Sequence, residues 1–265
     1  MDHSRLESLG HDDGNQVANH DDDDAPEKTL LGPFVDCVDD FRMMMKKYSV
    51  VICGSTVLHL FSHSKDWTTN DLDLFVSRDS LGEQGQILWH VFLTSVCKYN
   101  LCDDAGGLCP PDVQKFVYKK DDRVIDLAIL PCNPIEFHIE RFYGTHVLNY
   151  ATWNIAYCLF PQLSLRDRKM VVFRHLPYSA LLSFDKYRHR GFEHITIQDA
   201  CPRYPELDQL RSTGDAHCAV KPFSSIKLDA TQLETQLPSK LWFRLTEGKM
   251  RVNARYEYGH TDYDV

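Results

Sequence analysis

The sequence lacks any apolar run close to the roughly 20 residues that a membrane-spanning helix needs. Its first residues, Met1 to Arg5, contain no apolar core of a secretion signal. Its nine cysteines include no Cys-x-x-Cys pair, which argues against a zinc module. We therefore expect an intracellular protein, cytoplasmic or nuclear, that has no membrane partner and keeps its cysteines as reduced thiols in the core.

Basic side chains are scarce in the first 29 residues, which hold nine acidic residues against Arg5 and Lys28. This segment carries a formal charge of −7 out of the −9 of the whole chain, and it includes four consecutive acids at Asp21–Asp24. It has few large apolar side chains, so it cannot bury enough surface to offset the entropy lost on ordering. We predict a disordered acidic tail over residues 1–29.

Two short apolar runs carry the most informative residues of the chain. The run Val50–Cys53 ends in Gly-Ser, and the next run opens with Asp71-Leu72-Asp73. If Asp71 begins a strand, the period of two places Asp71 and Asp73 on one face and Leu72 on the other. Carboxylates that lie close together repel each other, and a divalent cation relieves the repulsion. The pattern therefore predicts a site for two-metal phosphoryl transfer.

The residues between these runs predict a turn from a strand into a helix. Thr56–Phe61 has apolar residues at helical spacing, and Ser55 suits the N-cap. Gly54 has no Cβ, so the backbone there can approach a ligand closely. A helix N-terminus also offers unpaired N–H groups and a positive dipole end, which favour phosphate. We expect Gly54 and Ser55 to contact phosphates.

A third acid lies inside a later apolar run. Residues 113–119 and 123–130 are typical of two strands joined by a tight turn, and Asp126 falls inside the second strand. A charged side chain in such a run is costly unless it is paired or bound to a metal. Asp126 is therefore the candidate partner of Asp71 and Asp73.

The order of Gly-Ser, helix, Asp-x-Asp strand and later acidic strand resembles the DNA polymerase β-type nucleotidyltransferase superfamily. The segments Asn133–Glu136, Phe142–Asn149 and Ala156–Pro161 are similar to those of uncharacterised fungal nucleotidyltransferase-like proteins, although Tyr143 stands where the fungal group would carry a histidine. The resemblance covers about residues 34–192. It implies an α/β (α+β) fold, with a mixed-sheet polymerase β-like core and a helical lobe.

The resemblance also implies a function: transfer of a nucleoside monophosphate from a nucleoside triphosphate to an acceptor hydroxyl. In that scheme the three acids are catalytic, they hold two Mg²⁺ (or Mn²⁺) ions, and Asp126 helps to deprotonate the acceptor. Gly54 and Ser55 hold the β- and γ-phosphates. The sequence leaves the acceptor open, because RNA, a protein and a small molecule all remain possible.

Positive charge gathers between Arg166 and Arg190, where seven basic residues stand against two acids. In a nucleotidyltransferase, some of these would meet the triphosphate or a polynucleotide acceptor. Lys186, Arg188 and Arg190 form the densest group, and we take them as nucleotide-binding candidates. For each of them alone, a solvated helix face is the simpler explanation.

Each motif has a simpler explanation when it is taken alone. Asp-x-Asp is common on solvated strand faces, Gly-Ser is a common turn, and Asp126 could be a buried acid paired with an arginine. The alternative function is a catalytically silent nucleotidyltransferase-like module that binds nucleotide or a protein. A third hypothesis is an interaction protein that uses the acidic tail and the basic segment.

The spacing of apolar residues predicts the remaining elements. Helices are expected at about 34–47, 56–65, 84–99, 146–160, 164–175 and 178–190, and strands at 48–53 and 71–77. The predicted units are a nucleotidyltransferase core at 34–132, a helical lobe at 133–192 and a loosely organised C-terminal extension at 193–265.

Overall fold

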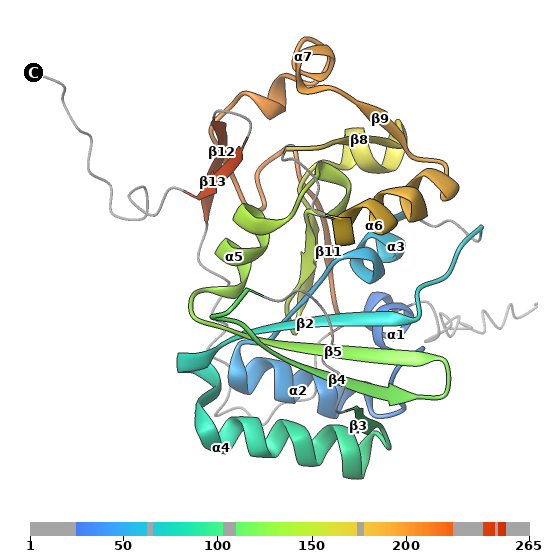
Figure 1. The fold of residues 1–265 in the computed structure, drawn as a ribbon, viewed down its shortest axis with the longest axis vertical. Coiled ribbons are helices and arrows are strands. Elements are labelled where there is room, and N and C mark those ends of the chain that lie inside the picture. Colours follow the sequence, from blue (N-terminus) through green and yellow to red (C-terminus); the bar gives the residue numbers. More distant parts are fainter. Residues whose placement is uncertain are drawn as a thin grey trace, which may run out of the picture.

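A mixed β-sheet of eight strands forms the centre of the protein (Figure 1). The computed structural model describes residues 25–62, 66–102, 110–173, 178–224, 241–246 and 249–252. The strand order is β11-β7-β6-β1-β2-β5-β4-β3, and every neighbouring pair is antiparallel except β2 and β5. The strands are β1 (Val51–Cys53), β2 (Asp71–Ser77), β3 (Asn100–Cys102), β4 (Gln114–Lys120), β5 (Arg123–Leu130), β6 (Asn149–Ala151), β7 (Ile155–Cys158) and β11 (Ala219–Pro222). The predicted α+β class is confirmed.

The elements around the sequence motifs form largely as predicted. Helix α3 (Ser55–Ser62) connects β1 to β2, and it begins at Ser55, which is therefore the first helical residue rather than the cap. The hairpin of β4 and β5 is confirmed, and Asp121 in its turn adopts a φ of 53°. The predicted helix at 34–47 is α2 (Val38–Tyr48), and that at 84–99 becomes α4 (Arg78–Val91) followed by the π-helical turn η2 (Phe92–Val96).

The two faces of the central sheet differ in what covers them. On one face, Leu72 and Leu74 of β2 are fully buried in a core with Phe41 of α2 and Trp89 of α4. Figure 1 shows α2 and α4 together on this side of the sheet. The opposite face carries the odd-numbered residues of β2, and there α5 (Pro134–Arg141) packs against Phe75. The alternation of β2 thus separates an apolar face from the face that bears its acids.

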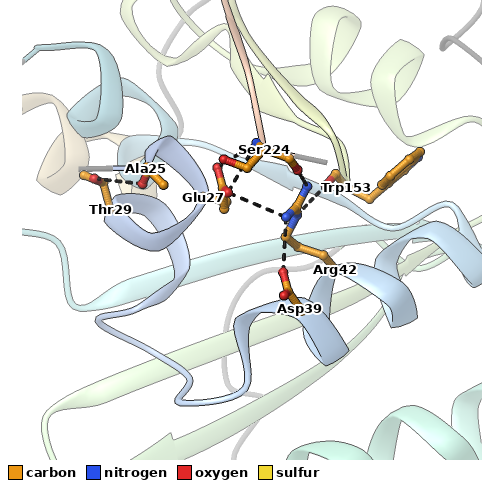
Figure 2. A network of polar contacts seen from close by, with 7 residues as sticks. All are labelled: Ala25, Glu27, Thr29, Asp39, Arg42, Trp153 and Ser224. Carbon is orange, nitrogen blue, oxygen red and sulfur yellow. Dashed lines mark hydrogen bonds and ion pairs between the residues drawn. The ribbon is translucent and has the colours of Figure 1, made fainter. Parts of the chain in front are cut away.

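A buried arginine connects segments that are far apart in the sequence (Figure 2). Arg42 of α2 has an exposed fraction of 1% and donates hydrogen bonds to the backbone oxygens of Trp153, at 2.8 Å, and Ser224, at 2.7 Å. Its guanidinium also forms ion pairs with Glu27, at 3.7 Å, and Asp39, at 3.3 Å. A buried cation with these partners is satisfied, whereas loss of Glu27 would leave it paired with Asp39, whose side chain is 71% exposed.

Two predicted helices in the second half of the chain are wrong. Residues 146–160 form the short turn η3 (Thr145–Val147) and then β6 and β7, which join the central sheet. These strands are almost completely buried, so their apolar residues do not alternate, and such a run cannot be told from a buried helix by its period. In the second predicted helix, at 164–175, residues 164–173 contain the end of the π-helical turn η4 (Gln162–Arg166) and β8 (Lys169–Val171), and Arg168 between them has a left-handed φ of 47°. Residues 174–175 lie outside the described residues.

The helix predicted at 178–190 is confirmed as α6 (Tyr178–His189). In the described part of residues 193–265, β11 extends the central sheet, and β9 (Glu193–Ile195) pairs with β8. A three-stranded sheet is formed by β10 (Arg211–Ser212), β12 (Trp242–Thr246) and β13 (Lys249–Val252). The remaining elements are α7 (Ile197–Ala200) and η5 (Pro205–Leu207). The domain boundaries at 132 and 192 stay predictions.

The end of the predicted acidic tail needs a correction. Helix α1 (Pro26–Leu31) begins inside it, and the Glu27 side chain is buried beside Arg42. Residues 1–24 lie outside the described residues, so the rest of the tail stays a prediction.

In the parts of the chain that are described, we find no helix with the length and hydrophobicity to cross a membrane.

Candidate functional site

The predicted acids lie on one face of two neighbouring strands. Asp73 of β2 is the register partner of Asp126 of β5. Asp71, two residues earlier on β2, is the register partner of Val124. Partners across a sheet point to the same side, so the three carboxylates share the face that is opposite the core of α2 and α4. The Asp71 side chain is 39% exposed and the Asp126 side chain is 20% exposed. The acids therefore lie at the border between the sheet and solvent.

The three acids disturb one another electrostatically. Burial, together with the neighbouring charges of Asp71 and Asp126, raises the pKa of Asp73 to about 7, whereas Lys115 and Lys186 act in the opposite direction. Desolvation and like charges both favour the protonated carboxyl group. Near neutral pH, Asp73 is therefore divided between its ionised and protonated forms.

Two lysines supply the positive charge at this site. Lys115 Nζ of β4 lies 2.6 Å from Asp126 Oδ2, and Lys186 Nζ of α6 lies 3.4 Å from Asp71 Oδ2. Asp126 is therefore a paired acid, as the simpler explanation of this residue held, but its partner is a lysine and not an arginine. The pattern of the sequence missed Lys115, because its position on β4 is opposite Ala128 and its side chain reaches Asp126 diagonally. Only the pairing of β4 with β5 shows this contact.

Gly54 lies against the acids, as its place in the motif suggested. Its φ is +80°, and a Cβ atom at this position would lie 2.7 Å from Asp73 Oδ2. The group that needs the space left by the missing Cβ is therefore the Asp73 carboxylate. The hydroxyl of Ser55, the next residue, is buried and has no hydrogen-bond partner. Cys53 is opposite Asp73 in the sheet, and burial raises the pKa of its thiol well above the usual value.

Two of the three predicted basic residues reach the acid-bearing strands. Besides Lys186, Arg190 follows α6 and donates a hydrogen bond of 3.2 Å to the backbone oxygen of Thr68, just before β2. Its guanidinium carbon lies 4.1 Å from the ring centre of Trp67 and 5.3 Å from that of Tyr187. Burial lowers the pKa of Arg190, and its Nη1 atom is buried without a hydrogen-bond partner. The guanidinium is held in place and keeps an unused donor.

Arg188 is not brought to the acids. It forms an ion pair of 3.6 Å with Asp185 one turn earlier on α6, and its side chain is 65% exposed. It lines a cleft of about 750 Å³ together with Phe184, His189 and His194. The three acids do not belong to this lining. For Arg188, the explanation as a solvated helix face agrees with the geometry.

The donor set of the site fits a hard divalent cation, because it consists of carboxylate oxygens. Asp126 Oδ1 is buried and lacks a hydrogen-bond partner, so it is available as a ligand. Among the described residues, however, no group of three His, Cys, Asp or Glu side chains is arranged to hold an ion as it stands. The carboxylates of Asp71 and Asp126 are instead paired with Lys186 and Lys115.

Comparisons with known proteins give little further information. No family model matches the chain, and no curated protein matches it. A solved structure titled "tRNA-processing enzyme (apo form I)" is similar over 51% of this chain and 35% of its own, with 14% sequence identity and a TM-score of 0.36. The match thus spans about a third of that structure. A likeness of this size supports no argument about the activity of the present chain.

Proposed function

We propose that this protein is a metal-dependent nucleotidyltransferase that moves a nucleoside monophosphate from a nucleoside triphosphate to an acceptor hydroxyl. The observation that carries the proposal is the register pairing of Asp73 with Asp126, together with Asp71 two residues earlier on the same face. Strands β2 and β5 are buried on their other face, and this burial fixes the register that places the acids next to each other. The resemblance of the motif order to polymerase β-type nucleotidyltransferases supports the same assignment.

Asp71, Asp73 and Asp126 would hold Mg²⁺ or Mn²⁺. When bound, such a cation stabilises negative charge on the reacting oxygens. The carboxylates themselves would position it. Burial, and after it the neighbouring charges of Asp71 and Asp126, raises the pKa of Asp73, and a bound cation would oppose this shift. Asp126 Oδ1, which has no hydrogen-bond partner, would accept the proton of the acceptor hydroxyl. The acceptor oxygen then forms a bond to the α-phosphorus, and pyrophosphate leaves with the bonding electrons.

The triphosphate would lie between the start of α3 and the residues of α6. The first N–H groups of a helix have no intrahelical partners and form the positive end of its dipole, so the start of α3 at Ser55 would attract phosphate. The unused Nη1 donor of Arg190 and the Lys186 ammonium supply positive charge nearby. Ser55 contributes its unpartnered hydroxyl. These groups account for the binding of phosphate but leave the base and the acceptor (RNA, a protein or a small molecule) unassigned.

The alternative is a catalytically silent module that binds nucleotide or a protein. The observation in its favour is the 2.6 Å ion pair of Lys115 with Asp126, which neutralises one acid without a metal. A module that binds only proteins differs from the enzyme in its response to cations, and the transfer of label separates the enzyme from a silent nucleotide-binding module. Mg²⁺ or Mn²⁺ with a nucleoside triphosphate should raise the melting temperature of the enzyme, and a module that only binds proteins should show no metal-dependent shift.

The decisive experiment follows the transfer of label. The protein is incubated with each labelled nucleoside triphosphate, Mg²⁺ and a fractionated cell extract, and the fraction that becomes labelled identifies the acceptor. Asp73→Asn should reduce labelling to background. Asp79→Asn is the matched control, because Asp79 is an exposed acid at the start of α4. Equal labelling by the parent protein and Asp73→Asn would contradict the proposal.

A further inference from the structure

Lys115 is a resident cation of the acid site that the sequence did not single out. Its ammonium lies 2.6 Å from Asp126 Oδ2, which is the short distance of a charge-assisted hydrogen bond. The Lys115 side chain is 28% exposed and that of Asp126 is 20% exposed, so solvent screens this pair less than a surface ion pair. The contact comes from β4, which is fixed to β5 along the whole hairpin. Lys115 is therefore placed by the fold.

The two oxygens of Asp126 have different environments. Oδ2 accepts the ammonium of Lys115, whereas Oδ1 is buried and has no hydrogen-bond partner. The carboxylate therefore offers one oxygen to the lysine and keeps one for another cation. Asp73, the register partner of Asp126, lies on the neighbouring strand on the same face. A single ion placed among Asp71, Asp73 and Asp126 Oδ1 would leave the lysine contact intact.

Charge balance decides how many cations this arrangement accepts. Three ionised carboxylates carry three negative charges, and one divalent cation together with Lys115 neutralises them. A second divalent ion would enter a site with no remaining net negative charge, beside the Lys115 ammonium. At a separation of about 4 Å, like charges near a protein surface repel by several kcal/mol. Lys186 adds to this balance more weakly than Lys115, because its side chain is 40% exposed and its ion pair with Asp71 is longer, at 3.4 Å.

We propose that the three carboxylates take one divalent cation, and that the Lys115 ammonium supplies the second positive charge on the Asp126 side. This inference rests on the proposed function, and it departs from the two ions that the resemblance implies. Lys115 is then a positioning residue. It orients Asp126 so that Oδ1 faces the ion and the acceptor hydroxyl, and it stands where a second metal ion would otherwise be required.

The test counts the Mn²⁺ ions that bind to the protein without nucleotide. Free Mn²⁺ is measured by electron paramagnetic resonance during a titration at pH 8 and fixed ionic strength. Lys115→Met removes the charge and keeps much of the apolar stem, and Lys115→Arg keeps the charge. Lys119→Met is the matched control, because Lys119 is an exposed lysine four residues along the same strand. Circular dichroism melts show whether each variant folds, and Lys115→Gln replaces Lys115→Met if the latter does not.

The parent protein, Lys115→Arg and Lys119→Met should each bind one Mn²⁺, and Asp73→Asn should lose it. In Lys115→Met, a second ion should bind, or bind at least about tenfold more tightly than any second ion of the parent, because the competing charge is gone. The inference is overturned if Lys115→Met binds the same number of ions with the same affinities as the parent protein. If the parent protein binds no Mn²⁺ at all, the proposed function fails together with it.

Discussion

Asp73 and Asp126 are register partners on the parallel strands β2 and β5, and the apolar residues on the other face fix this relation. Leu72 and Leu74 are fully buried and pair with Ile125 and Leu127. A slip of one residue would turn the acids into the core and the leucines to the opposite side. The burial of apolar side chains thus sets the separation of the two carboxylates.

The first prediction concerns the stability of the metal-free protein as a function of pH. The pKa of Asp73 is raised to about 7 in the folded protein, whereas in the unfolded chain it is close to 3.8. The folded state therefore binds more protons between pH 4 and 7, and stability falls as the pH rises through this window. Asp73→Asn abolishes this dependence. With EDTA, the variant should equal the parent at pH 4 and exceed it at pH 8 by about 2 kcal/mol, after allowance for partial exposure.

Urea denaturation of both proteins at pH 4, 6 and 8 measures this difference. Addition of Mg²⁺ at pH 8 should stabilise the parent protein and leave Asp73→Asn unchanged, because the variant lacks a ligand. If Asp73 were instead held in a stabilising ion pair, the variant would be less stable than the parent at pH 8. That result, with no response of the parent to metal, would count against the metal site.

The second prediction concerns two glycines with positive φ, Gly54 and Gly82, of which only Gly54 lies against Asp73. Gly54→Ala introduces a Cβ atom 2.7 Å from Asp73 Oδ2 and places alanine at a φ of +80°, so both the carboxylate and the backbone must shift. Gly82→Ala is the matched control, because Gly82 also has a positive φ of +59° but a Cβ atom added there would have no neighbour within 4 Å. Gly82 has a ψ of 173°, a conformation that only glycine adopts readily, so Gly82→Ala should cost about 1–3 kcal/mol through backbone strain. Gly54→Ala should cost at least as much, because its contact with Asp73 adds to the strain. Only Gly54→Ala should weaken Mn²⁺ binding. If both variants lowered the affinity for Mn²⁺ equally, the space beside Gly54 would not be what keeps Asp73 in position.

Much of the acid site follows from local patterns in the sequence. The strict alternation of β2 predicted that Asp71 and Asp73 share a face, and the turn signals around Asp121 predicted the hairpin that bears Asp126. These features depend on residues that are near each other in the sequence. The parallel pairing that makes Asp126 the partner of Asp73 does not, because it is set by packing across the whole sheet.

The features that the sequence did not predict depend on how strands pair and are covered in the folded protein. β8 forms because Lys169–Val171 pairs with Glu193–Ile195. β6 is buried between β1 and β7, which removes the alternation that would have marked it as a strand. The Lys115 contact likewise depends on how β4 pairs with β5. No periodicity within a segment carries such information.

The third prediction concerns the N-terminal segment. Deletion of residues 1–24 should leave the melting temperature nearly unchanged, because this stretch has few large apolar groups to bury. Deletion of residues 1–29 also removes Glu27, which pairs with the buried Arg42 and accepts hydrogen bonds from the backbone N–H of Ser224. Without Glu27, the buried Arg42 keeps only Asp39 as an acidic partner among the described residues, and the Asp39 side chain is 71% exposed. Removal of one partner from a buried ion pair costs about 3–5 kcal/mol, so the longer deletion should lower the melting temperature by many degrees. Equal melting temperatures would show that Glu27 contributes nothing to stability.

The fourth prediction distinguishes two arginines that the sequence treated alike. Arg190 is held between Trp67 and Tyr187 and keeps a buried Nη1 donor, whereas Arg188 is exposed and pairs with Asp185. A charge-assisted hydrogen bond to phosphate contributes about 1.5–3 kcal/mol, so Arg190→Gln should weaken the binding of a nucleoside triphosphate with Mg²⁺ by about 10- to 150-fold.

Arg188→Gln is the matched variant, and it should bind the nucleotide as the parent protein does, because Arg188 lines a cleft that does not include the acids. Isothermal titration calorimetry with the same nucleotide measures both affinities, and thermal melts check that both variants are folded. Equal losses in the two variants would mean that the basic residues act only through the overall charge of α6. A loss confined to Arg188→Gln would move the nucleotide from the acid-bearing strands to the cleft beside Phe184.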